Sequence, residues 1–175
     1  MISRIFIKLF PFVFVVFFIY LESAPIYFFD NELVKPLMTF TIIYCWIQHD
    51  GDRFRPLWLL FFGLFYDFLK DGIVGVTPFF FLTMYHLRNN NFGFIAINYL
   101  NNIWMRFSTI LFFYFSSLFF INFLLEDFSY AIYKNLISFF LSIILFPLFY
   151  SLIQKLSIMF GRLNDWKKKQ FSVNS

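Results

Sequence analysis

The sequence predicts an all-α integral membrane protein with about six transmembrane helices packed in one bundle. Three observations support this. First, 61% of the 175 residues are hydrophobic and only 14% are charged, whereas soluble domains carry about 45–50% apolar and about 25% charged residues. Second, the apolar residues form solid runs without the alternation that a membrane β-barrel requires. Third, the basic residues gather in alternate loops.

The apolar runs divide the chain into six predicted helices. A helix crosses the hydrocarbon core with about 20 residues, which the fifth and sixth segments reach easily. The second, third and fourth are short, so they either begin inside the flanking loops, thin the bilayer locally or include re-entrant pieces. In chain order the six segments are Ile5–Leu21, Leu37–His49, Leu57–Leu69, Ile73–Leu87, Ile103–Leu125 and Leu136–Phe160.

Local signals justify the first three segments. The first has Arg4 and Lys8 near its start, then a long apolar run, and so resembles a signal peptide, but a cleavage site needs small residues at both key positions. Leu21-Glu22-Ser23 and Glu22-Ser23-Ala24 each place a large residue there, so the segment is predicted to be an uncleaved span. Pro11 is expected to kink or delay its helix. Pro36 and Pro56 open the second and third helices, because proline is tolerated at a helix start.

The basic residues predict the orientation, because loops rich in Lys and Arg stay in the cytoplasm. With the N-terminus inside, eleven of the 14 basic residues are cytoplasmic, and an even number of spans returns the C-terminus to the same side. We therefore expect a multi-pass protein of the bacterial inner membrane with both termini cytoplasmic. The cytoplasmic set is Arg4, Lys8, Arg53, Arg55, Arg88, Arg106, Lys155, Arg162, Lys167, Lys168 and Lys169, and the outer set is Lys35, Lys70 and Lys134.

The domain organisation follows from the same segments. No linker is long enough to separate two domains and no repeat is evident, so residues 1–175 are predicted to form a single polytopic domain. It ends in a short basic tail at about 161–175, which is expected to lie beside anionic membrane lipids. A nucleic-acid partner is not expected, since the tail has no aromatic stacking platform beyond Trp166.

The sequence shows no arrangement of residues that is typical of catalysis. It has one cysteine, Cys45, and two distant histidines, His49 and His86, which leaves little from which to build a zinc site. Nucleophile-elbow, metalloprotease, Walker and dinucleotide-binding motifs do not occur. We therefore expect no enzymatic activity, no metal and no cofactor.

The most informative stretch runs from Arg55 to Phe81 and places one carboxylate, Asp67, in an apolar segment. A charge in hydrocarbon costs roughly 2.5–3.5 kcal/mol on insertion scales, so it needs a partner or a purpose. We expect a structural residue near the outer interface, held by Lys70 or by backbone donors of the following turn. Two alternatives are a ligand-binding or proton-handling role and a contact to a partner's transmembrane helix.

The glycines around Asp67 predict a tight helical hairpin. Gly63 lies four residues before Asp67, and a small residue there permits close approach of another helix. Gly72 and Gly75 bracket a short connection that needs backbone conformations open mainly to glycine. Gly72 is expected to end the third helix, and Pro78 follows in the fourth.

This pattern resembles the core motif of the MreD rod shape-determining family. The resemblance covers Pro36 to Leu87 and includes an apolar segment that ends at Tyr44-Cys45-Trp46. Lys70 and Asp71 depart from it, because the family often has smaller or apolar residues there. The motif G-L-x-x-D-x-L-x-x-G-x-x-G is matched by Gly63, Leu64, Asp67, Leu69, Gly72 and Gly75, with Arg55 and Pro56 upstream.

The resemblance implies a non-enzymatic scaffold component of the machinery for lateral cell-wall elongation. Its implied partners are an MreC-like scaffold protein and, through it, MreB and the RodA–penicillin-binding-protein synthase. The implied fold is similar to the substrate-binding subunits of energy-coupling-factor transporters. The alternative function is a small-molecule-binding subunit of a transporter, which would need a polar pocket. The Ser and Thr hydroxyls of the spans more often bond back to the preceding helical turn.

Overall fold

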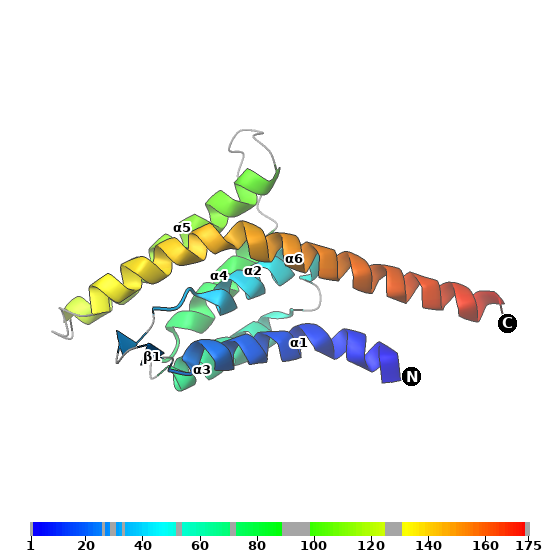
Figure 1. The fold of residues 1–175 in the computed structure, drawn as a ribbon, viewed down its shortest axis with the longest axis horizontal. Coiled ribbons are helices and arrows are strands. Elements are labelled where there is room, and N and C mark those ends of the chain that lie inside the picture. Colours follow the sequence, from blue (N-terminus) through cyan, green and yellow to red (C-terminus); the bar gives the residue numbers. More distant parts are fainter. Residues whose placement is uncertain are drawn as a thin grey trace.

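The computed structural model describes residues 2–25, 27–28, 31–32, 34–51, 54–70, 73–88, 99–124 and 131–173. Six helices and one pair of two-residue strands lie within these ranges (Figure 1). In chain order they are α1 (Ile2–Ser23), β1 (Tyr27–Phe28), β2 (Asn31–Glu32), α2 (Met38–Asp50), α3 (Pro56–Leu69), α4 (Val76–Leu87), α5 (Tyr99–Leu124) and α6 (Ala131–Val173).

The six helices coincide with the six predicted segments, although several of their ends differ. Helix α3 ends at Leu69, as the predicted segment does; Asp71 and Gly72, the residue expected to end the helix, lie outside the described residues. The predicted start of α4 at Ile73 was wrong, because a left-handed Gly75 precedes the first helical residue, Val76. Finally, α6 continues to Val173, through most of the segment expected to be a basic tail.

Helix α2 lies at the centre of the bundle. Every residue of 39–47 is buried, and α2 contacts α1, α4 and α6. A helix that is covered on all sides must be apolar all round, which explains why this segment shows no polar face. The other helices surround it and are joined by contacts between α1 and α3, α3 and α4, α4 and α5, and α5 and α6.

Aromatic rings fill the space between α2 and its neighbours. The Phe40 ring lies 4.8 Å from that of Phe81 and 4.5 Å from that of Tyr114, measured between centroids. Nearer the other end of α2, the rings of Phe107 and Phe146 stack at 4.4 Å. Aromatic pairs at these separations add about 0.5–1.5 kcal/mol each beyond their buried area, so they are a main source of cohesion for this bundle.

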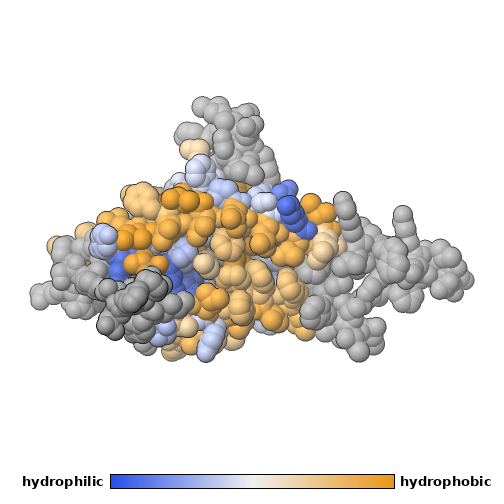
Figure 2. Space-filling model, in the orientation of Figure 1, coloured by the Kyte–Doolittle hydropathy of each residue, from blue (hydrophilic) through white to orange (hydrophobic). Residues whose placement is uncertain are grey.

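The outward faces of the bundle are apolar as well. Two helical segments, Asn102–Ile121 and Tyr133–Met159, are long and apolar enough to cross a membrane. Only 28% of each is buried, whereas a helix in the core of a soluble protein would be mostly covered. Figure 2 shows a broad hydrophobic band across the middle of the visible face, with hydrophilic patches to either side of it. This surface suits hydrocarbon.

The two ends of the bundle differ in which parts of the chain they hold. Strands β1 and β2 pair antiparallel between α1 and α2, with Tyr27 opposite Glu32 and Phe28 opposite Asn31. In Figure 1 the first turn of α1 and the last turn of α6 point toward the end of the molecule opposite these strands. An even number of helices brings the two ends of the chain to one side.

Candidate functional site

Helices α3 and α4 approach closely at Gly63. A Cβ atom added to Gly63 would lie 2.4 Å from Cα and 2.5 Å from the nitrogen of Pro78. Both residues are buried. Because backbone atoms cannot turn aside as a side chain can, only glycine allows this approach. The structure thus gives Gly63 the close helix contact that its spacing predicted.

Asp67 joins the same two helices one turn further along α3. Its side chain is 3% exposed, and the backbone N–H of Gly75 donates to its Oδ2 atom at 2.8 Å. Gly75 has a φ of +105°, in the left-handed region, and comes directly before α4. Of the two partners expected for Asp67, a backbone donor of the following turn is therefore present.

The remaining motif residues are divided between the two ends of α3. Arg55 precedes the helix in extended conformation and Pro56 is its first residue; both are exposed. Leu64 is half-buried, and Leu69 is exposed at the far end. Gly72 lies outside the described residues. The structure therefore brings together Gly63, Asp67, Gly75 and Pro78, which we call the hairpin clamp, and leaves Arg55 and Pro56 apart from it.

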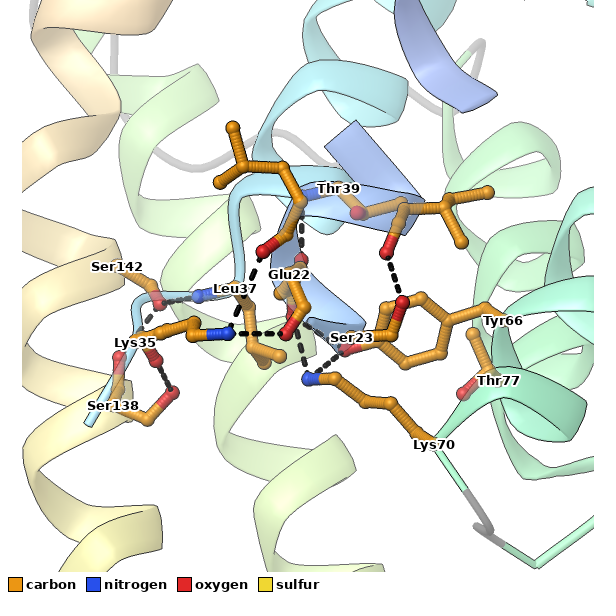
Figure 3. Close-up of polar contacts among 12 residues, drawn as sticks. Glu22, Ser23, Lys35, Leu37, Thr39, Tyr66, Lys70, Thr77, Ser138 and Ser142 are labelled. Atoms are coloured by element: carbon orange, nitrogen blue, oxygen red, sulfur yellow. Dashed lines mark hydrogen bonds and ion pairs between the residues drawn. The ribbon is translucent and has the colours of Figure 1, made fainter. Parts of the chain in front are cut away.

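A second polar site centres on Glu22, at the end of α1, whose side chain is 4% exposed. Its Oε1 atom accepts from the Tyr66 hydroxyl at 2.5 Å and forms an ion pair with the Lys70 ammonium at 2.7 Å. Its Oε2 atom accepts from the backbone N–H of Thr39 at 3.0 Å. Lys70 also donates to the Tyr66 hydroxyl at 2.7 Å. Figure 3 shows these groups converging from three helices; we call them the Glu22 junction.

Lys35 extends this network to the last carbonyls of α1. Its ammonium donates to the carbonyl oxygens of Glu22 at 3.2 Å and of Ala24, where a positive charge stabilises a helix C-terminus. From α6, the Ser138 hydroxyl donates to the Lys35 carbonyl at 2.7 Å, and the Ser142 hydroxyl accepts from the Leu37 N–H at 2.7 Å. Residues 35–37, just before α2, are thus fixed to the end of α1 and to α6 (Figure 3).

The polar groups of these two sites bond to one another and to the backbone of the bundle. Every contact given above satisfies a backbone or side-chain group of the bundle itself. Within the ranges that the structure describes, no group of three or more His, Cys, Asp or Glu side chains could hold a metal ion. Several span hydroxyls bond back to the preceding turn as expected, among them Thr41, Thr83, Ser108, Thr109 and Ser142.

Sequence reasoning missed Glu22 as a site residue. It follows the first predicted span and was considered as part of a cleavage site. Its partner Lys70 is one of the two residues that depart from the expected motif, and in the structure it forms an ion pair with Glu22. A basic residue at the outer end of one span and an acidic residue at the outer end of another are the only sequence signal of this pair.

Comparison with known proteins places the hairpin in a family. The model of the rod shape-determining protein MreD family matches residues 3–156, a range that contains the hairpin clamp and the Glu22 junction. No curated protein and no solved structure matches the chain. The expected likeness to substrate-binding subunits of transporters thus stays a prediction. Because the family model covers most of the sequence, the chain belongs to the MreD family of rod shape-determining proteins.

Proposed function

We propose that this chain is a non-enzymatic scaffold component of the machinery for lateral cell-wall elongation in a rod-shaped bacterium. The observation that carries the proposal is the family match over residues 3–156. Membership implies a role in rod shape determination, and the family is one of shape-determining membrane proteins, not a known enzyme family. The proposed partners are an MreC-like scaffold protein and, through it, MreB and the RodA–penicillin-binding-protein synthase.

The geometry supports a scaffold in two respects. The motif residues Gly63, Asp67, Gly75 and Pro78 are used to pack and fasten two helices, and this is what a rigid platform for partners requires. Large apolar side chains, such as Phe61, Phe79 and Phe120, remain exposed on α3, α4 and α5. Such surface suits lipid or the transmembrane helices of partners.

We further propose a multi-pass protein of the inner membrane with both termini in the cytoplasm. The excess of basic residues on that side supports it, as does the position of both chain ends at one end of the bundle (Figure 1). A periplasm-dependent reporter fused after Ser129 should be active, and the same reporter fused after Phe160 should be inactive. The reverse pattern would refute the orientation.

Complementation tests the function itself. In a rod-shaped host depleted of its own MreD-family protein, expression of this chain with its cognate MreC-like protein should restore normal cell width. The tagged chain should also retain the MreC-like protein on purification from native membranes. A matched control is Tyr133→Ala, which changes an exposed residue of α6. Membrane accumulation without recovery of cell width and without copurification would contradict the proposal.

The alternative role, a small-molecule-binding subunit of a transporter, draws no support from the family match. The buried polar groups also favour the scaffold, because the Glu22, Tyr66 and Lys70 side chains satisfy one another. We therefore do not propose it.

A further inference from the structure

Helix α6 contains a proline in the middle of its apolar segment. Pro147 has no backbone N–H, so the carbonyl of Ile143, four residues earlier, loses its helical donor. Both residues lie within Tyr133–Met159, the segment apolar enough to cross a membrane. Water is absent from hydrocarbon, and a carbonyl left without a donor there costs several kcal/mol.

Trp104 of α5 supplies the missing donor. Its indole Nε1–H donates to the Ile143 carbonyl oxygen at 3.1 Å. The side chain is 36% exposed, so it lies on the outer surface of the α5–α6 pair instead of filling the core. The bond therefore joins the two helices at the residue where the α6 ladder is interrupted.

The interruption coincides with a change of direction. Figure 1 shows α6 running along the bundle in its first half, then bending in its middle and extending away from the other helices. Proline is a common cause of such a bend, because its ring also clashes with the carbonyl one turn earlier. The half beyond the bend carries five of the chain's basic residues: Lys155, Arg162, Lys167, Lys168 and Lys169.

We propose that Trp104 is a positioning residue that holds the bend of α6. Its indole N–H replaces the donor that Pro147 removes, and so fixes the direction in which the basic half of α6 leaves the bundle. This inference is independent of the proposed function, since it depends only on the contact between α5 and α6.

A double-mutant cycle tests the link between Trp104 and Pro147 in the full-length protein. Pro147→Ala restores the helical N–H, so the Ile143 carbonyl no longer needs the indole. In the native background Trp104→Phe, which keeps a ring but loses the donor, should raise the unfolding equilibrium constant about three- to tenfold. In the Pro147→Ala background it should raise the constant less than about twofold.

Trp58→Phe serves as the matched control, because Trp58 is an exposed tryptophan of α3. Its effect should be the same with and without Pro147→Ala. Unfolding is followed in detergent mixed with increasing sodium dodecyl sulfate. If Trp104→Phe fails to accumulate, recovery by added Pro147→Ala supports the proposal. An equal effect of Trp104→Phe in both backgrounds, or no recovery, would overturn it.

A second measurement reports the direction of α6 beyond the bend, which would not change if Trp104 contributed only to stability. Spin labels are attached through Phe113→Cys on α5 and Ile158→Cys beyond the bend, where both native side chains are exposed. The buried Cys45 is replaced by Ala in all labelled proteins. Trp104→Phe should broaden the distance distribution of this pair. It should leave unchanged the pair Phe113→Cys and Phe140→Cys, which lies before the bend. An unchanged distribution across the bend would overturn the proposal.

Discussion

The hairpin clamp and the Glu22 junction both fasten the C-terminal end of α3, but they are built in opposite ways. The clamp comes from one continuous stretch, Gly63 to Pro78, and depends on shape: a missing side chain and a left-handed glycine. The junction comes from three helices and depends on charge. Its bonds to Glu22 span 17 residues to Thr39 and 48 residues to Lys70.

This difference determines how each region responds to a substitution. In the clamp, any added atom at Gly63 meets the backbone of Pro78, and the two helices must separate. In the junction, removal of one group leaves its partners in place but unpaired, and a partner that can reach solvent recovers part of the loss. Lys70 is such a partner, since its side chain is 31% exposed. An added side chain at Gly63 should therefore have a larger effect than the loss of one group from the junction.

The largest effect is expected for Gly63→Leu. Four added carbon atoms cannot fit where even Cβ would lie 2.4 Å from Pro78 Cα, and overpacking against a rigid neighbour is relieved only by moving the helix. Little folded protein should accumulate in the membrane, as measured by in-gel fluorescence of a fusion after detergent extraction.

Leu60→Ala is the control for this variant, because Leu60 lies on the same helix with its side chain exposed. It should accumulate as the native protein does. Equal accumulation of Gly63→Leu and Leu60→Ala would show that α3 and α4 are not held together at this point.

The second effect is expected for Glu22→Leu, which removes the acceptor at the centre of the junction. The donors Thr39 N–H and Tyr66 O–H would each lose their acceptor, at about 1–3 kcal/mol each. Glu22→Gln keeps an acceptor and should lose less. The free energy of unfolding, measured in mixed detergent micelles, should fall in the order native, Gln, Leu.

Tyr20→Leu is a suitable control for these variants, because Tyr20 lies on α1 with its side chain exposed. Its unfolding free energy should stay near the native value. A Glu22→Leu protein as stable as the control would show that the junction contributes nothing to stability.

How well the sequence predicts each region depends on how far apart its residues lie in the chain. The segments and the hairpin were predictable, since hydropathy fixes the helices and the spacing of Gly63 to Asp67 places both on one side of α3. The burial of α2 on all sides was not predictable, because its composition resembles that of its lipid-facing neighbours. The pairing of Glu22 with Lys70 was not predictable either. The two charges lie at the ends of separate helices, and only the tertiary packing brings those ends together.

The third-largest effect is expected at Asp67, where two variants distinguish the loss of its charge from the loss of its hydrogen-bond acceptor. Asp67→Asn retains an oxygen that can accept from the Gly75 N–H, so stability and rod shape should be largely kept. Asp67→Leu leaves that N–H unpaired and should cost about 1–3 kcal/mol. Unfolding, cell width and copurification of the MreC-like protein are the measurements. Loss of shape with Asn, at normal protein level and normal copurification, would instead indicate a charge-dependent step.

The smallest effect is expected for Gly75→Ala, because no atom lies within 4 Å of the added Cβ and only the backbone conformation opposes it. A non-glycine residue at a φ of +105° is strained by about 1–3 kcal/mol. Asparagine tolerates positive φ better than most residues, so Gly75→Asn should lose less stability than Gly75→Ala. This order is opposite to the one that size would give, since the larger side chain is the milder change. If Asn costs as much as Ala or more, the turn before α4 is limited by space and not by the left-handed conformation of Gly75.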